Sequence, residues 1–385
     1  MSLTDTRVDP GVDRFIDRIR AAAADGQPLR IRGGGTKDFY GERLEGEVLD
    51  TRPLAGIVSY EPSELVVTAR AGTPLAALEA ALAEKGQSLA FEPPHFSPGS
   101  ADAATVGGMV AAGLSGPSRA AVGSVRDFVL GTQIINGRGE LLTFGGQVMK
   151  NVAGYDVSRL MAGSLGTLAL IAEVSLKVLP VAPAEATLRF ALDEAAMITR
   201  LNTWGGQPLP LNASSWVQDA NGPALYLRLR GAVAAVEAAC TRLLRELPGE
   251  RLDNAVAAPD WQAARELSLP WFAAGFARGD TLWRLSVPAV TPPLNVGDTL
   301  IDWFGAQRWV FLAAGDAEHA HRLRHAAAMA GGHAQRFRAP GSDAAAARVD
   351  AFDPLRAPLD RIHRELKREF DPAGIFNRGR MYADL

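Results

Sequence analysis

A loop of three consecutive glycines is the first feature of this sequence that could do chemistry. Residues 33–37 read Gly-Gly-Gly-Thr-Lys, and the run over residues 28–32 predicts a short strand before them. Successive glycines can turn several backbone N–H groups toward one point, which forms a nest for phosphate oxygens, and the lysine can add positive charge. A flexible turn without a ligand would be the better explanation if the loop stood alone.

The loop matches neither of two common nucleotide-binding motifs. The P-loop pattern Gly-x4-Gly-Lys-Ser/Thr is absent from the sequence, and no Gly-x-Gly-x-x-Gly follows a predicted strand. The main sequence argument for an NAD-type Rossmann domain is therefore missing.

Two further segments are rich in small residues. Residues 104–116 read ATVGGMVAAGLSG, and residues 148–180 read VMKNVAGYDVSRLMAGSLGTLALIAEVSLKVLP. Small side chains after Gly107 and Gly108 would let the backbone pack closely against a flat ring. Composition alone leaves two explanations open, namely tight turns around a bound ligand or a turn-rich region that binds nothing.

Together with the glycine loop, these segments resemble the FAD-binding domain of the vanillyl-alcohol-oxidase superfamily, in the same order. The resemblance is strongest to the FAD-binding subunits of bacterial glycolate oxidases. It is carried by RGGGTKDFYG at 32–41, GLSGPSRAAVGSVRDFVLGTQIING at 113–137, MKNVAGYDVSRLM at 149–161 and IHRELKREFDPAGIFNRGRMY at 362–382. Several long motifs in one order are far more specific than any single motif.

The resemblance implies an α+β fold that is rich in α/β units. A PCMH-type FAD-binding domain of two α/β subdomains would span residues 1–182, an α+β cap domain would span 183–345, and residues 346–385 would return to the FAD domain. The residues that would contact the cofactor are also implied. They are Gly33, Gly34, Gly35, Thr36 and Lys37 at the pyrophosphate, Thr105, Gly107, Gly108 and Ser115 along the flavin and its linker, Gly163, Gly166, Thr167 and Ile171 at the rest of the dinucleotide, and Asn377 near the ring.

Two departures from the wider superfamily limit what the resemblance implies. Relatives that attach FAD through histidine often place it where this chain has Thr36, so we expect FAD to be bound non-covalently. Catalytic 2-hydroxy-acid dehydrogenases of the superfamily usually carry cap histidines with a Glu-His pair that bind a metal. No matching constellation is present, so we assign no catalytic residue and expect no metal.

The histidines of the cap and tail offer three candidate roles, namely metal binding, substrate contact and catalysis. His321 and His325, four residues apart and preceded by Glu318 and His319, could share one helical face and bind a metal, but this stretch reads as a solvated surface. His333 is a weak candidate for substrate contact. His363 is more readily explained by packing than by catalysis.

Composition excludes several classes of function. The formal net charge of -3 gives no electrostatic case for nucleic-acid binding. The single cysteine, Cys240, excludes an intrachain disulfide and any four-thiolate iron–sulfur or zinc site made by this chain alone. Electrons that pass through iron–sulfur centres would therefore need another chain.

The sequence predicts neither a secretory signal nor a membrane-spanning helix. The first 15 residues lack a basic stretch followed by an apolar run, and the most apolar stretch, 165–182, is interrupted by Glu173, Lys177 and Pro180. We expect a cytoplasmic protein. Membrane contact would be peripheral, at the inner face of the cytoplasmic membrane and through the complex.

The elements that must position the motifs can be read from periodicity. Apolar spacing predicts helices over residues 10–25, 75–86, 155–162 and 359–370, and a strand over 65–69. All seven tryptophans lie between Trp204 and Trp309, where they would form the cap core or a surface for a partner.

The predicted function is an FAD-dependent oxidoreductase acting on CH–OH groups. It would oxidise glycolate or another small 2-hydroxy acid, with a larger FAD-binding catalytic subunit and an iron–sulfur subunit as the partners that the family implies. Three hypotheses stay open: a chain that is catalytic by itself, an FAD-binding relay or structural partner of a catalytic subunit, and an unrelated α/β module without flavin. The absent metal constellation favours the relay.

Overall fold

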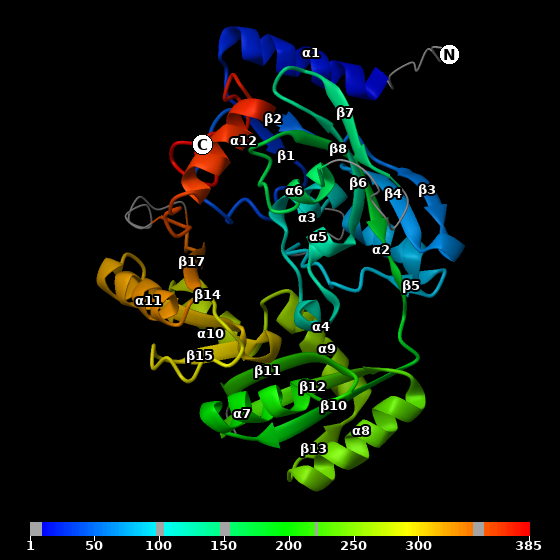
Figure 1. Cartoon of the computed structure of the whole chain (residues 1–385), viewed down its shortest axis with the longest axis vertical. Coiled ribbons are helices and arrows are strands. Elements are labelled where there is room, and N and C mark those ends of the chain that lie inside the picture. The colour runs from blue at the N-terminus through cyan, green and yellow to red at the C-terminus, as the bar shows by residue number, and fades with distance from the viewer. Residues whose placement is uncertain (1–9, 98–103, 147–154, 220–221, 342–349) are drawn as a thin grey trace.

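The chain forms two packed parts, joined a second time by its C-terminal tail. The computed structural model describes residues 10–97, 104–146, 155–219, 222–341 and 350–385. Figure 1 shows the N-terminal part, residues 10–180, lying above a second part that we call the cap, residues 184–338. The red tail helix returns from the cap to the N-terminal part.

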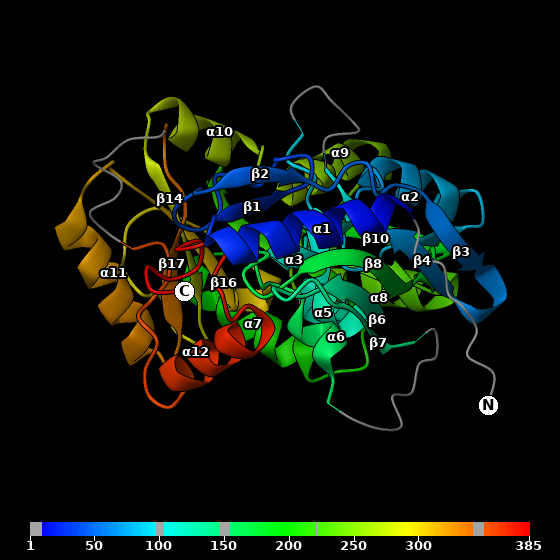
Figure 2. The same cartoon turned by 90° about the horizontal axis from the view of Figure 1, so that it is seen from above.

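The N-terminal part begins with a helix packed on two parallel strands. Its elements are α1 (Pro10–Asp25), β1 (Leu29–Arg32) and β2 (Glu47–Asp50). Phe15, Ile16 and Ile19 form the apolar stripe of α1 and are buried in one cluster with Leu29. Figure 2 shows α1 lying along this pair of strands. The predicted helix over 10–25 is confirmed.

A five-stranded antiparallel sheet forms the rest of the N-terminal part. Its order is β3 (Ile57–Glu61), β4 (Val66–Arg70), β8 (Leu170–Lys177), β6 (Val129–Ile135) and β7 (Leu141–Gly145). One face packs against α2 (Leu75–Ala83) and α3 (Val106–Ala112), and the other packs toward α1. The sheet thus fixes α3 beside β1, and the glycine loop follows β1.

Short elements complete this part. They are η1 (Pro62–Glu64), β5 (Gln87–Ser88) paired with β9 (Leu179–Pro180), α4 (Arg119–Val122), α5 (Val125–Phe128) and α6 (Val157–Leu160). The helix predicted over 155–162 is thus wrong in length. It is a single turn, because Asp156 caps its start and Gly163 takes a φ of +84° shortly after its end.

The cap is built on one eight-stranded antiparallel sheet. Its order is β13 (Glu250–Leu252), β10 (Ala184–Ala191), β12 (Gly222–Gly231), β11 (Leu211–Asp219), β15 (Thr299–Asp302), β16 (Gln307–Leu312), β14 (Thr281–Ser286) and β17 (His333–Arg338). The mixture of α and β matches the predicted fold class. The domain limits at 182 and 345 stay a prediction.

Helices cover both faces of the cap sheet. They are α7 (Glu194–Gly205), α8 (Val233–Glu246), α9 (Asn254–Arg265), α10 (Pro270–Ala277), the 3-10 turn η2 (Trp303–Gly305) and α11 (Ala317–Met329). In Figure 1, α9 and α10 lie on the side of the N-terminal part. Six tryptophans are buried and Trp271 is half-buried, so they serve mainly as cap core.

The tail helix α12 (Leu359–Phe370) is anchored on the N-terminal part by a buried lysine. Lys367 Nζ donates to the carbonyl oxygens of Thr167 and Phe376 and to the carboxylate of Asp371, at 2.7–2.8 Å. The segment after α12 then runs beside β1, where the Leu29 N–H donates to the Ile375 carbonyl. The predicted helix over 359–370 is confirmed.

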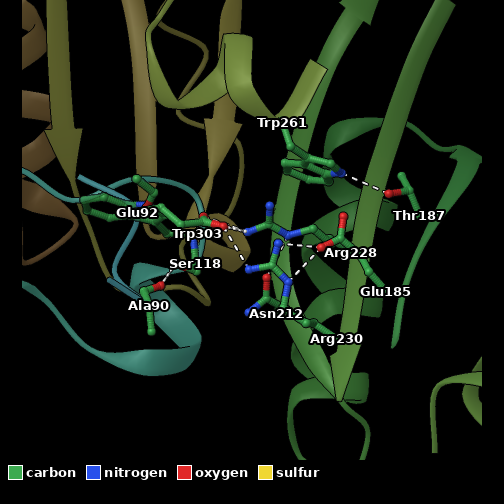
Figure 3. Close-up of polar contacts among 11 residues, drawn as sticks. Ala90, Glu92, Ser118, Glu185, Thr187, Asn212, Arg228, Arg230, Trp261 and Trp303 are labelled. Atoms are coloured by element: carbon green, nitrogen blue, oxygen red, sulfur yellow. Dashed lines mark hydrogen bonds and ion pairs between the residues drawn. The ribbon is translucent and has the colours of Figure 1, made fainter. Parts of the chain in front are cut away.

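A buried ion-pair network joins the cap to the N-terminal part. Figure 3 shows Glu92, from the segment before α3, facing Arg228 and Arg230 on β12. Arg228 Nη2 lies 2.8 and 2.7 Å from the two Glu92 carboxylate oxygens, and Arg230 Nη1 lies 3.0 Å from one of them. The side chain of Arg228 is only 3% exposed.

Further contacts hold the arginines in place. Arg228 Nε donates to Asn212, its guanidinium lies 4.8 Å from the Trp261 ring, and Arg230 also pairs with Glu185. Burial opposes the charge on Glu92, but the two guanidinium groups outweigh it and lower the pKa of that carboxyl. The network therefore works only as a complete set, because a lone buried charge is costly.

Glu92→Gln should destabilise the folded chain by about 3 kcal/mol, because a neutral amide leaves the Arg228 guanidinium buried without a counter-charge. The measurement is urea-induced unfolding at pH 7. The pKa of Glu92 is lowered in the folded chain, so its contribution is complete above its ordinary pKa of 4.5 and is lost as the pH falls through the folded value.

The matched control for this prediction is Glu237→Gln, which removes an exposed pair with Arg251. Exposed pairs contribute little to stability, so this variant should unfold like the wild type. Equal midpoints for Glu92→Gln and Glu237→Gln would show that the network does not stabilise the joint between the two parts.

Candidate active site

The glycine loop opens onto a pocket that we call the glycine-loop pocket. It has a volume of about 600 Å³, including the part open to solvent. Its walls come from the end of β1, the loop at 33–37, α3, Leu165 and the tail residues Asn377 and Arg380. Elements far apart in sequence therefore meet around the loop.

Two of the loop positions need glycine, one because a neighbouring side chain lies close to it and one because of its backbone conformation. A Cβ on Gly33 would lie 2.2 Å from Thr105 Oγ1, the atom that accepts a hydrogen bond from the Gly108 N–H at the start of α3. Gly35 has a φ of +76°, which favours glycine. The backbone is thus bare where a ligand would touch it, which fits a phosphate cradle.

Tail side chains hold the loop in position. Asn377 Oδ1 accepts from the Ile31 N–H at 2.7 Å, and its Nδ2 donates to the Leu165 carbonyl at 2.6 Å. Arg380 donates to the carbonyl oxygens of Lys37 and Asp38 at 3.1 and 3.0 Å. These hydrogen bonds hold the residues just before and just after the three glycines, and the pocket beside the glycines remains open.

The charge in the pocket is positive. Asp38 pairs with Arg30 and Arg32, which leaves Lys37 and Arg380 as additional cations in the lining. Burial lowers the pKa of Lys37 to about 8 and that of Arg380 to about 10, and both remain mainly charged at pH 7. A positive, glycine-lined hollow fits a pyrophosphate group.

A second cavity, which we call the interdomain pocket, lies where the cap meets the N-terminal part. It has a volume of about 360 Å³, including the part open to solvent, and is lined by residues 114–117 on one side and by cap residues from α9, β14, β15, η2, β16 and β17 on the other. Ala111 and Ala112 of α3 line the glycine-loop pocket, and the chain continues directly into 114–117. One continuous segment therefore serves both pockets.

Cationic and aromatic groups meet in the interdomain pocket. Arg284 on β14 donates from Nη2 to Gln335 at 2.8 Å and to the Tyr40 hydroxyl at 3.3 Å, while its buried Nε has no partner among the described residues. The Arg119 guanidinium lies 4.4 Å from the Trp303 ring. Burial and then the nearby Arg284 charge lower the pKa of Arg119. Arg119 itself does not line the pocket, whereas Arg284 does and could bind an anion there.

One carboxylate also lines the interdomain pocket. Asp302, the last residue of β15, is 9% exposed and accepts a hydrogen bond from Trp309 Nε1 at 2.9 Å. Burial raises its pKa to about 6, against the opposing effect of hydrogen bonds from Trp309, Ser215 and Gln307. The pocket thus contains both an anion-binding group and a proton-accepting group.

Most of the residues predicted to bind cofactor line one of these pockets. The glycine-loop pocket contains Gly33, Gly34, Gly35, Thr36, Lys37, Thr105, Gly108 and Asn377, and the interdomain pocket contains Ser115. The others line neither pocket. Gly107 packs on Ala71, Gly163 lies against Gly113, Gly166 lies against Asn377, and Thr167 and Ile171 are buried. Their cofactor contacts remain predictions.

Sequence reasoning missed Asp302 and Arg380, which line the two pockets. Arg380 belongs to the tail motif, so its position in that motif was an available signal. No local signal marked Asp302, since its surroundings come from neighbouring strands. Residues 149–154 of the MKNVAGYDVSRLM motif lie outside the described residues.

The histidines do not gather at either pocket. His95 contacts Glu79, His319 contacts Asp316, and His333 is exposed on β17. His363 lies 5.9 Å from the Tyr382 ring. Within the described ranges, no group of three or more His, Cys, Asp or Glu residues could hold a metal ion.

Comparisons with known proteins agree with this geometry. A family profile described as FAD binding domain matches residues 12–145. Glycolate oxidase subunit GlcE of Escherichia coli (strain K12) is 46% identical over 96% of this chain and 97% of that protein. A D-lactate dehydrogenase of Archaeoglobus fulgidus is 35% identical, over 40% of this chain and 33% of that protein.

A solved structure extends the comparison to the whole fold. Alkyldihydroxyacetonephosphate synthase matches 95% of this chain and 74% of its own, with a TM-score of 0.67 and 15% identity. At that identity the likeness concerns the fold alone. The N-terminal part is an FAD-binding domain, and the glycine-loop pocket fits that cofactor.

Gly33→Val should weaken FAD binding by about 100-fold or more, because the new side chain would displace Thr105 Oγ1 and fill the phosphate cradle. Fluorescence titration of the apoprotein with FAD gives the affinity. Gly205→Ala, at a glycine with no atom within 4 Å of the added Cβ, is the control. Wild-type affinity in a folded Gly33→Val chain would place the phosphates elsewhere.

Proposed function

The chain belongs to the family of the glycolate oxidase subunit GlcE, and from that premise we propose that it oxidises glycolate or another small 2-hydroxy acid in the interdomain pocket. FAD would be held non-covalently by the N-terminal part, with its pyrophosphate on the glycine loop. The reaction product would be the 2-oxo acid, which is glyoxylate when the substrate is glycolate.

The observation that carries this proposal is the continuity between the two pockets. Residues 105–112 line the pocket with the phosphate cradle, and residues 114–117 line the pocket with Arg284 and Asp302. A dinucleotide seated on the loop and extending along this segment would reach the interdomain pocket. The anion-binding groups would then lie at the reactive end of the cofactor.

The chemistry divides between cofactor and protein. FAD, when bound, supplies the acceptor for the hydride of the substrate C–H bond. Arg284 binds the substrate carboxylate through its unpartnered Nε and neighbouring nitrogens. Arg119 adds positive charge from the N-terminal part, and Trp303 holds the Arg119 side chain in place. These cations orient the hydroxyl-bearing carbon within the pocket.

We further propose that the chain works in a multi-subunit oxidase. One supporting fact is that its GlcE relative is named as a subunit of glycolate oxidase. Another is that the single cysteine, Cys240, is buried in the cap. A larger FAD-binding subunit and an iron–sulfur subunit would complete the electron path. Across the described residues, no helix is long and apolar enough to span a bilayer. We propose a cytoplasmic location, with membrane contact made through the complex.

Anaerobic mixing of the FAD-loaded chain with glycolate tests the function directly. We expect flavin bleaching in a stopped-flow spectrometer, with a saturable dependence on glycolate. Arg284→Met should raise the glycolate dissociation constant by about 10- to 100-fold, because a charge-assisted hydrogen bond to the carboxylate is lost. Arg251→Met, at a surface pair with Glu237, is the control. Bleaching that requires the partner subunits would make the chain an electron relay.

FAD should leave the protein on denaturation, because Thr36 occupies the position at which relatives attach FAD through histidine and Cys240 lies on α8 of the cap. Acid precipitation followed by centrifugation separates free from attached flavin. A yellow supernatant and a colourless washed pellet are expected. Flavin retained in the pellet would contradict the non-covalent assignment.

A further inference from the structure

We propose that Asp302 is the catalytic base that accepts the proton of the substrate hydroxyl. The inference rests on the proposed function, since it assigns a role within the same pocket. It is carried by the lining of the interdomain pocket, by the hydrogen bonds that hold the Asp302 carboxylate, and by the absence of an ion-pair partner for it among the described residues.

The lining leaves one choice of base. Of the described residues that line the interdomain pocket, the ionisable ones are Arg265, Arg284 and Asp302. The guanidinium groups of the two arginines are hydrogen-bond donors without acceptor capacity. His333 and Lys37, which could accept a proton, do not line this pocket. Asp302 is therefore the only lining side chain suited to general-base chemistry.

The surroundings of Asp302 fix its position and leave it anionic. Trp309 Nε1, on the neighbouring strand β16, donates a hydrogen bond to the Asp302 carboxylate at 2.9 Å. No ion pair of the described residues includes Asp302, whereas Arg265 lies 2.9 Å from Glu266. A buried carboxylate without a counter-ion is costly, so a purely structural acceptor for the Trp309 indole would be served better by a neutral amide.

The backbone presents Asp302 to the N-terminal part. Trp303 and Phe304 follow it with φ values of +53° and +57°, a left-handed conformation that is uncommon for non-glycine residues. The Trp303 indole donates to the Gly116 carbonyl at 3.0 Å. The turn therefore ties the end of β15 to the segment 114–117, against which the cofactor would lie.

The pKa of Asp302 suits the role. Burial raises it to about 6, so the carboxylate is mainly deprotonated at pH 7 yet basic enough to share a proton. In the reaction, the substrate O–H bond breaks and its proton passes to Asp302. FAD, when bound, would supply the acceptor for the hydride that leaves C2, and the C2–O bond would become double. Asp302 then returns the proton to solvent.

The experiment compares Asp302→Asn with the wild type in the full FAD-loaded chain. We expect the limiting rate of flavin reduction by glycolate to fall by about 10²-fold or more, while affinities for FAD and oxalate are kept. The wild-type rate should decline as the pH falls through about 6 because the base becomes protonated, and the variant should lack this decline. Asp298→Asn is the matched control, since exposed Asp298 likewise accepts an indole N–H, from Trp271.

A second measurement does not depend on turnover. Infrared difference spectra of the wild type should contain a carboxyl band that titrates near pH 6, shifts to higher pH when oxalate binds, and is absent from Asp302→Asn. A titration unaffected by oxalate would overturn the placement of Asp302 at the substrate, even if the variant fails to fold.

The two proposals fail in different ways. Wild-type reduction rates in Asp302→Asn would overturn the base assignment and leave the proposed function standing. A wild-type chain that binds FAD but is not reduced by glycolate would refute the proposed function, and the oxalate-dependent titration would then decide the role of Asp302.

Discussion

The structure depends on the contacts that fix the conformation of the glycine loop at residues 33–37. Three consecutive glycines have no side chains to pack, so the loop must be positioned by groups from elsewhere. Asn377 and Arg380 do this through hydrogen bonds to backbone atoms on both sides of the loop. Lys367 fixes the tail that carries them. The shape of the glycine-loop pocket follows from this arrangement, because Asn377 and Arg380 also line it.

The second requirement is a fixed distance between the cap and the N-terminal part. Arg284 and the carboxylate of Asp302 belong to the cap, whereas the cofactor would lie on the N-terminal part. The ion pairs of Glu92 with Arg228 and Arg230 restrain this distance (Figure 3). Because Arg228 is buried and charged, a small separation of the two parts would leave its charge without a partner, which opposes the separation.

Sequence reasoning found what is encoded locally. The helices at 10–25 and 359–370 have clear apolar periodicity, and the glycine loop is visible as a motif. The helix at 155–162 was overestimated because a single capped turn has the same pattern over a few residues. Asp302 could not be found from the sequence, since its burial and its hydrogen bonds arise from adjacent strands and from the facing domain.

The hydrogen bonds between the glycine loop and the tail can form only after the ribosome has synthesised the tail. Asn377 is synthesised 346 residues after Ile31, whose backbone N–H donates a hydrogen bond to the Asn377 side chain. At about 5 to 20 residues per second, this separation corresponds to roughly 20 to 70 seconds on the ribosome. Throughout that interval the nascent N-terminal part has its glycine loop but not the groups that hold it. Cofactor loading is therefore a late step in the life of the chain, and a molecule interrupted in the cap would have the motif without a formed binding site.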